Sequence, residues 1–195
     1  FSIETTNRAE ILVFTNMAQC YKSRLSDFED SKASLLGDYL PQKLGMDPGE
    51  TVLSVLLPGD YKGHVLFFYE NGKAAKVPLS AYETKTNRRR LTGAFSDKSP
   101  LVKAMAMDAD AQLVVYTTDS RAVIFSTALL LPKTTRNTQG VAVVSLKKKA
   151  TLSGVMPLEN SGIVNASRYR SKNIPAAGAI LKEEDSPEKQ ITFEM

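Results

Sequence analysis

Short runs of β-branched and aromatic residues recur along the chain and predict β-strands. Three segments share one order: an opening strand, a tight turn, a return strand and, further on, a closing apolar strand. The opening strands are expected at 11–15, 65–69 and 113–117. The return strands are expected at 19–25, 73–79 and 121–127. The closing strands are expected at 51–57, 101–107 and 151–156. The pattern indicates an all-β protein.

The three segments are copies of one another over ten ungapped positions. They read LVFTNMAQCY from Leu12, LFFYENGKAA from Leu66 and VVYTTDSRAV from Val114, and they start 54 and then 48 residues apart. A period near 50 residues indicates an array of supersecondary units, and for β units it favours propeller blades. The aromatic residue at the third position of each copy is expected to pack in the core.

Turn residues support about four strands per copy, one blade each. Asn71-Gly72 is a strong hairpin signal, because both residues accept a positive φ. A polar, basic stretch follows each return strand and leads to a glycine: Gly37, Gly93 and Gly140. Helical signals are sparse. The segment 26–36 is either a single helical turn with a capping box or an irregular loop.

The repeats set the expected domain organisation. One β-pinwheel or propeller-like domain is predicted over 1–181, with repeats at 11–63, 64–111 and 112–163. Residues 1–10 and 164–181 could add a partial blade, which gives about three to four blades in an open or incomplete array. Residues 182–195 are charged and contain Pro187, so they are expected to form a mobile tail.

Composition excludes several classes of protein. Of the 195 residues 43% are hydrophobic, yet no run approaches eighteen apolar residues, so no membrane span is expected. The start at Phe1 lacks a Met and a signal peptide, which suggests a cut through a longer protein. The single Cys20 excludes an internal disulfide and fits the reducing cytoplasm. Cys20 and the single His64 cannot form a zinc site, and no metal is expected.

Charge is distributed unevenly along the chain. The net charge is −3 over residues 1–63, +3 over 64–111, +4 over 112–163 and zero over 164–195. Positive charge is therefore concentrated in the second and third repeats, which suits a polyanionic partner better than an even scatter would.

These repeats resemble the C-terminal DNA-wrapping domain of the A subunits of bacterial type IIA topoisomerases, DNA gyrase and topoisomerase IV. The resemblance lies in the opening motif Leu12–Asn16 and its copies in the later repeats, in the basic loop Thr134–Gly140, and in the closing run Val52–Pro58. It covers residues 11–163. The resemblance implies a β-pinwheel of four-stranded blades. Members often carry about five or six blades, whereas three copies are clear here.

The resemblance also implies a function. The domain is expected to bind and bend duplex DNA without sequence preference, and to hold the transported DNA segment near the cleavage gate. The glutamine-arginine-arginine-glycine-glycine box of gyrase is absent, which favours a topoisomerase IV-like subunit. The catalytic tyrosine would lie upstream of this chain, so the fragment itself is not expected to be an enzyme or to hold a cofactor. The implied partners are duplex DNA, the rest of the A subunit and the ATPase B subunit, in the bacterial cytoplasm at the nucleoid.

Phosphate contact needs exposed cations on loops that a duplex can follow. The candidates share a place in the basic stretches of successive repeats, and they are Lys32, Lys85, Arg88, Arg89, Arg90, Lys133 and Arg136. A second cluster, Lys147-Lys148-Lys149, either extends this basic track or forms a solvated turn that protects a strand edge. Arg168, Arg170 and Lys172 are further possibilities.

Two other functions compete with DNA binding. A propeller-type protein-interaction module would explain the repeats equally well, but it would not predict basic loops in repeats two and three. An enzyme with its site in a ring channel is the second alternative. The sequence offers no catalytic triad, phosphate loop or metal cluster to support it.

Overall fold

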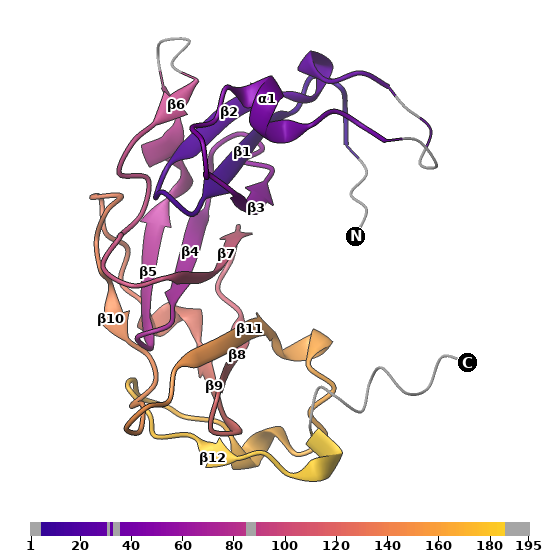
Figure 1. Cartoon of the computed structure of the whole chain (residues 1–195). Coiled ribbons are helices and arrows are strands. Elements are labelled where there is room, and N and C mark those ends of the chain that lie inside the picture. Colours follow the sequence, from indigo (N-terminus) through magenta and orange to yellow (C-terminus); the bar gives the residue numbers. More distant parts are fainter. Residues whose placement is uncertain (1–4, 31, 33–35, 85–88, 186–195) are drawn as a thin grey trace.

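The described residues fold as three four-stranded antiparallel sheets that follow one another in an open arc (Figure 1). The computed structural model describes residues 5–30, 32, 36–84 and 89–185. From the inner to the outer edge, sheet 1 contains β3 (Val52–Leu56), β1 (Glu10–Thr15), β2 (Cys20–Arg24) and β6 (Arg90–Leu91). Sheet 2 contains β7 (Leu101–Met107), β4 (His64–Tyr69), β5 (Lys73–Pro78) and β10 (Val141–Ala142). Sheet 3 contains β11 (Leu152–Pro157), β8 (Gln112–Thr117), β9 (Arg121–Ser126) and β12 (Ala179–Ile180). The predicted fold class, an open array of four-stranded blades, is confirmed.

Each sheet borrows its outermost strand from the next part of the chain. Three strands of a sheet come from one repeat, but β6, which pairs with β2, comes from the second repeat. In the same way β10 joins sheet 2 from the third repeat, and β12 joins sheet 3 from the segment after it. The prediction of four-stranded blades is confirmed, but the expectation that all four strands of a blade come from one copy is wrong. The basic stretches cross to the preceding sheet, where their backbone groups find hydrogen-bond partners.

Pairing also corrects the alignment of the repeat glycines. The residue that precedes the borrowed strand is Gly140 in sheet 2 and Gly178 in sheet 3, both with φ of 70°. A Cβ on Gly140 would overlap the carbonyl of Ala74, so only glycine fits. The equivalent residue of sheet 1 is Arg90. Gly93 is therefore not equivalent to Gly140: it lies after the borrowed strand β6 and has open space around it.

The core lies between successive sheets. Phe14, Phe68 and Tyr116 occupy one register position and are buried in three successive apolar clusters, as predicted. Between sheets 1 and 2 the ring of Phe14 makes edge-on contacts with Phe67 and Tyr82, at centroid distances of 5.3 and 5.5 Å. Such aromatic pairs contribute about 0.5–1.5 kcal/mol each beyond their burial. The sheets therefore form one continuous structure.

The face of sheet 1 that is turned away from sheet 2 is covered by residues of the first repeat itself. Helix α1 (Leu40–Leu44) places Leu44 against the apolar cluster of Ile11, Val13 and Tyr21. Pro41 lies in the first turn of this helix, about where the later repeats have their borrowed strands, and proline cannot donate a strand hydrogen bond. Of the two alternatives for 26–36, the structure has a short helical turn only at the start, the 3₁₀ turn η1 (Leu25–Asp27); residues 31 and 33–35 of that segment lie outside the described residues.

The C-terminal segment covers sheet 3. Besides β12 it contains the 3₁₀ turns η4 (Leu158–Asn160), η5 (Ala166–Arg168) and η6 (Glu183–Asp185). Tyr169 is buried against the sheet and donates a 2.7 Å hydrogen bond to the carboxylate of Asp185. The segment thus caps the array and, among the described residues, forms no further sheet. Packing reaches Asp185, past the predicted start of the tail at 182, because that carboxylate also accepts the Val164 amide.

Two further 3₁₀ turns, η2 (Leu79–Tyr82) and η3 (Thr127–Leu129), follow the return strands β5 and β9. In the described part of the chain, no helix has the length and apolar character needed to span a membrane.

Candidate nucleic-acid interface

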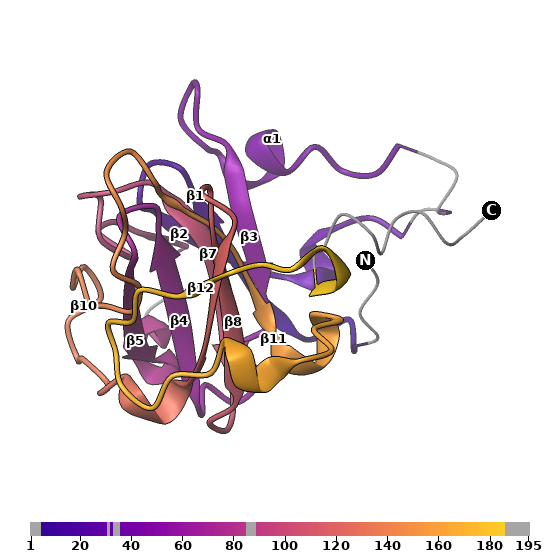
Figure 2. The same ribbon diagram turned by 90° about the horizontal axis from the view of Figure 1, so that it is seen from below.

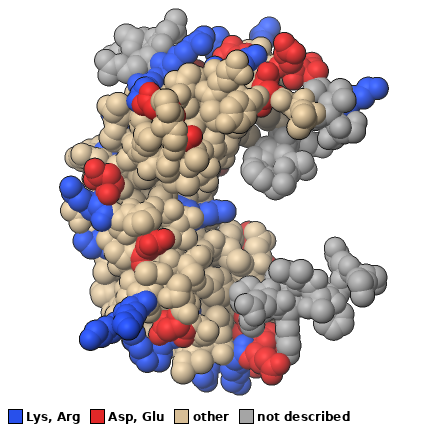
Figure 3. Space-filling model, viewed as in Figure 1, with Lys and Arg blue, Asp and Glu red and all other residues tan. Residues whose placement is uncertain are grey.

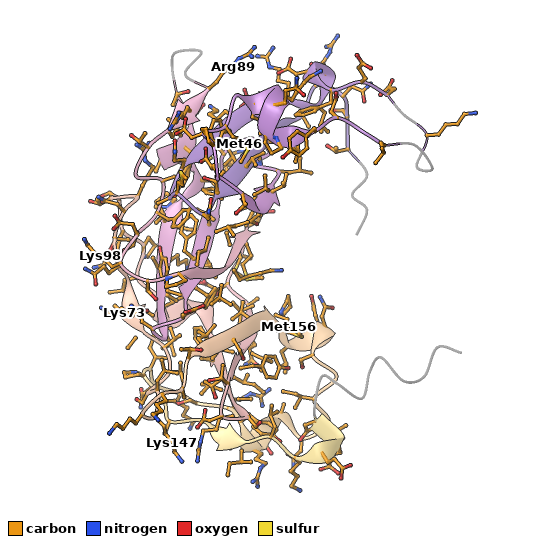
Figure 4. The ribbon with its side chains drawn as sticks, in the orientation of Figure 1. Met46, Lys73, Arg89, Lys98, Lys147 and Met156 are labelled. Carbon is orange, nitrogen blue, oxygen red and sulfur yellow. The ribbon has the colours of Figure 1, made fainter. Side chains whose placement is uncertain are left out.

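Cationic side chains follow the convex side of the arc, where the borrowed strands lie. Figure 2 shows β10 outside β5 and β4, so the crossing segments form the outer edge of the array. Figure 3 shows Lys and Arg atoms at several places along this side, with a few acidic groups among them. In Figure 4 the labelled Arg89, Lys98, Lys73 and Lys147 succeed one another along it. We use the term outer rim for Lys73, Arg89, Lys98, Lys133, Lys147, Lys148 and Lys149.

The turns that lead into β3, β7 and β11, the inner strands of the three sheets, differ in charge from one repeat to the next. Strand pairing aligns Thr15–Val52, Tyr69–Leu101 and Thr117–Leu152. The four-residue turns at 47–50, 96–99 and 147–150 are therefore equivalent. They carry two acids in the first repeat, one acid and one lysine in the second, and three lysines in the third. The outer rim is therefore most basic at sheet 3.

The lysines of the third repeat are free to meet a ligand. Lys133 and Lys147–Lys149 are exposed. The Lys133 amide bonds the Lys76 carbonyl of β5, which places Lys133 at the outer edge of sheet 2. Lys149 has a φ of 70° in a turn that the Ala150 amide closes on the Lys147 carbonyl. This turn lies beside the hairpin between β8 and β9, because the Thr118 amide bonds Thr151.

The basic stretch of the second repeat lies one sheet earlier than expected. It runs along the edge of sheet 1, where the Arg89 carbonyl accepts the Lys22 amide and the Arg89 side chain is exposed. Lys85 and Arg88 lie outside the described residues. Lys32 is exposed on the segment between η1 and α1. Figures 1 and 2 both show the described parts of that segment extending away from the outer rim, so the structure does not bring Lys32 to the other cations.

Arg90 is held by the protein itself. Its guanidinium forms a two-pronged ion pair with Asp47, with one N–O distance of 3.1 Å. It also donates to the Gln19 amide oxygen and lies 5.8 Å from the Tyr21 ring centroid. The hydrogen bonds from Arg90 hold the pKa of Asp47 below its usual range. Arg90 therefore ties the borrowed strand β6 to the turn before β3, which leaves it less able to contact phosphate than Arg89.

Arg136 is likewise partly committed. Its guanidinium donates a 3.0 Å hydrogen bond to the Ala81 carbonyl and lies 6.0 Å from the Tyr82 ring centroid. The side chain is half-buried. It therefore links the crossing segment of the third repeat to the turn η2 of the second, which leaves fewer of its N–H groups available to a phosphate.

Two rim lysines were missed by the sequence analysis. Lys73 follows the Asn71-Gly72 turn and donates to the Gln139 side chain at 3.2 Å. Lys98 is exposed and lies 3.8 Å from Asp97. Lys98 aligns with Lys149 once the turns are matched by strand pairing, a signal that requires the register. Neither lysine belongs to a run of basic residues, which is why the search for charge clusters missed them.

The described residues hold no group of three or more His, Cys, Asp and Glu side chains suited to a metal ion. Cys20 is fully buried, and burial raises the pKa of its thiol far above the usual range. Burial lowers the pKa of His64, near Lys76. The outer rim therefore presents cations that can bind an anion, and its described side chains offer no nucleophile of lowered pKa.

Comparison with known proteins identifies the fold. No protein-family model and no curated protein matches the chain. Among solved structures, the C-terminal domain of DNA topoisomerase IV superposes with a TM-score of 0.69 at 21% identity, over 80% of this chain and 49% of that one. The C-terminal domain of DNA gyrase A gives 0.67 at 14% identity, over 93% and 64%. The ParC C-terminal domain of E. coli gives 0.67 at 12% identity, over 93% and 80%. The chain has the β-pinwheel fold of these domains and spans about half the length of the first.

Proposed function

We propose that this chain binds duplex DNA along its outer rim, without sequence preference, and bends it. The observation that carries the proposal is the alignment of exposed lysines and Arg89 along the convex side of one continuous array. Lysine and arginine side chains that neutralise phosphates release counterions, which supplies most of the affinity of non-specific DNA binding. Base readout would need an element that enters a groove, and the rim carries turns and crossing segments instead.

Bending follows from the shape of the rim. Phosphates can meet cations on sheets 1, 2 and 3 at once only if the duplex follows the curve of the array. Smooth bending of a short site by 40–90° costs of order 1–6 kcal/mol, which additional phosphate contacts offset. Any preference among sequences would then reflect how readily each one bends.

The fold suggests the larger protein in which such a domain works. By analogy with the domains that it superposes on, the chain would be the C-terminal domain of a type IIA topoisomerase A subunit in the bacterial cytoplasm. The missing gyrase box favours topoisomerase IV. The rest of the A subunit would supply the catalytic tyrosine, an associated B subunit would hydrolyse ATP, and this domain would position the transported segment.

A salt titration tests DNA binding. If about six phosphates are neutralised, log K against log salt falls with a slope near −5, which costs roughly a thousandfold in affinity between 50 and 200 mM salt. Fluorescence anisotropy with a labelled 30-base-pair duplex measures this. A propeller-type protein-interaction module, the competing function, would show little affinity for the duplex even at 50 mM salt, and that result would remove the proposal.

A pair of variants locates the surface. Replacing Lys147, Lys148 and Lys149 together with Ala should weaken binding at least about tenfold and reduce the salt slope by about 3. The matched control is Lys103→Ala. Lys103 is exposed on β7, the edge strand of sheet 2 farthest from β10, and its loss should leave affinity nearly unchanged. If the triple variant and Lys103→Ala lost the same affinity per charge removed, the outer rim would have no special role in binding the duplex.

A further inference from the structure

One register position carries a lysine in the first two sheets and an apolar residue in the third. Lys22 pairs with Leu12, Lys76 with Leu66 and Ile124 with Val114, so the three residues are equivalent. Their side chains project from the return strands β2, β5 and β9. A lysine therefore occurs at this position in sheets 1 and 2, where another described sheet follows, and isoleucine occurs in sheet 3.

Lys76 is buried at the junction between sheets 2 and 3. It is 8% exposed, and its ammonium lies 2.6 Å from the Asp110 carboxylate and 3.4 Å from the Thr127 carbonyl. Asp110 belongs to the link between β7 and β8, and Thr127 begins η3. The Thr127 hydroxyl donates to Asp110 at 2.8 Å and accepts the Ala111 amide at 3.0 Å. One ammonium thus bridges the link and the turn η3 of the third repeat.

Lys22 performs the same task between sheets 1 and 2. Its side chain is 11% exposed, and its ammonium donates to the Thr84 hydroxyl at 3.2 Å. It lies 5.0 Å from the ring centroid of Tyr61, in the link between β3 and β4, and 4.0 Å from the Glu10 carboxylate. The Tyr61 hydroxyl donates to Glu10 at 2.7 Å. Here too a buried ammonium joins one sheet to the link and to a turn of the next repeat.

Among the described residues no sheet follows sheet 3, and its equivalent residue is covered differently. Ile124 is fully buried with Tyr169 and other apolar residues of the C-terminal segment, and its amide bonds the Tyr169 carbonyl at 2.8 Å. An apolar contact suffices where the chain only closes the array. This contrast indicates that the lysines serve the junctions themselves, since burial alone would be satisfied by isoleucine.

We propose that Lys22 and Lys76 are positioning residues that fix the angle between successive sheets, and through it the curvature of the outer rim. Apolar burial is non-directional, so neighbouring sheets could rock against each other over an apolar core without losing much of it. A buried ammonium loses its hydrogen bonds when its partners move, which makes one orientation preferred. Given the proposed DNA binding, the same contacts would set the bend of the bound duplex.

The first test uses the protein without DNA. Spin labels on introduced cysteines at Lys103 and Ser153, on the inner edges of sheets 2 and 3, report the distance between those sheets; Cys20 is buried and serves as the unlabelled background. Lys76→Met should broaden the distance distribution at least about twofold while the chain stays folded. Lys73→Met, three residues away on the same strand, is the control and should leave the distribution unchanged. An unchanged distribution in folded Lys76→Met protein would overturn the inference.

A second variant and a DNA measurement complete the test. Asp110→Asn keeps the shape of the carboxylate but removes its charge, so it should broaden the same distribution if Lys76→Met fails to fold. In a duplex labelled at both ends, energy transfer should report a smaller average bend with Lys76→Met than with Lys73→Met, even though Lys73→Met removes a rim cation. Duplex binding with an unchanged bend would contradict the link to curvature, whereas no duplex binding by the unaltered protein would contradict the proposed function alone.

Discussion

Two adjacent arginines at the edge of sheet 1 have different surroundings and should behave differently. Arg90 is bonded to Asp47 and Gln19, and Arg89 is exposed beside it. Arg89→Ala should therefore weaken duplex binding several-fold at unchanged melting temperature. Arg90→Ala should lower the melting temperature, because it removes the contacts that tie β6 to the turn before β3, and change affinity less. Thermal melts and anisotropy on both variants measure this; the reverse order would show that Arg90 contacts DNA.

Gly140 is the glycine whose replacement should matter most for stability. A Cβ there would overlap the backbone of Ala74 at a φ of 70°, so Gly140→Ala should cost about 3 kcal/mol or more. Gly93 has a φ of 58° with open space around it, so Gly93→Ala should cost only about 1–2 kcal/mol. Urea unfolding compares the two variants. Equal losses would contradict the close approach of Gly140 to the backbone of Ala74.

At the scale of elements, the ion pair between buried Lys76 and exposed Asp110 at the second junction should make stability depend on pH. The hydrogen bonds from Lys76 and then Thr127 hold the pKa of Asp110 below its ordinary value of 3.8. A carboxyl group with a lower pKa in the folded state contributes stability above its unfolded pKa and loses it as pH falls through the folded value. The difference in unfolding free energy between the unaltered protein and Lys76→Met should therefore shrink from pH 6 to about pH 2. Urea titrations at both pH values measure it, and a constant difference would show that Asp110 is not the partner that matters.

Most strands of this fold can be predicted from the sequence, but the pairing between them cannot. The strand 101–107 was predicted with the bounds that β7 has, and the other eight long strands were predicted to within one residue at each end. These strands can be predicted because the alternation of apolar and polar residues and the turn residues are local signals. The borrowed strands β6, β10 and β12 are two residues long, and their partner lies in another repeat, so no local pattern distinguishes them from loop. Helix α1 was missed because only five residues form it.

The charges of the candidate interface are local signals as well, whereas its contacts are not. Runs of cations such as Lys147–Lys149 can be read directly from the sequence. The commitment of Arg90 to Asp47 could not be predicted, because it depends on contacts across 43 residues. The isolated Lys73 and Lys98 become members of the rim only when pairing register aligns the turns. Sequence thus identified the charge, and the structure determines which charges are free.

At the scale of the whole molecule, the array is built to act as one curved body. Apolar clusters join the three sheets, and α1 and the C-terminal segment cover the two ends of the array. In the proposal above, Lys22 and Lys76 hold neighbouring sheets together. The acidic turn of the first repeat and the lysine turn of the third make the rim electrically uneven. A bound duplex should therefore be held most firmly at sheet 3, which the triple replacement of Lys147–Lys149 measures.

Lysine footprinting tests the central claim most directly. The chain is acetylated briefly with and without a 30-base-pair duplex at 50 mM salt, and each lysine is quantified by mass spectrometry. Lys73, Lys98, Lys133 and Lys147–Lys149 should be protected by DNA, while Lys103 on the inner edge of sheet 2 should react equally in both samples. Protection of Lys103 with continued reactivity of the rim lysines would place the DNA on the other side of the array and contradict the account.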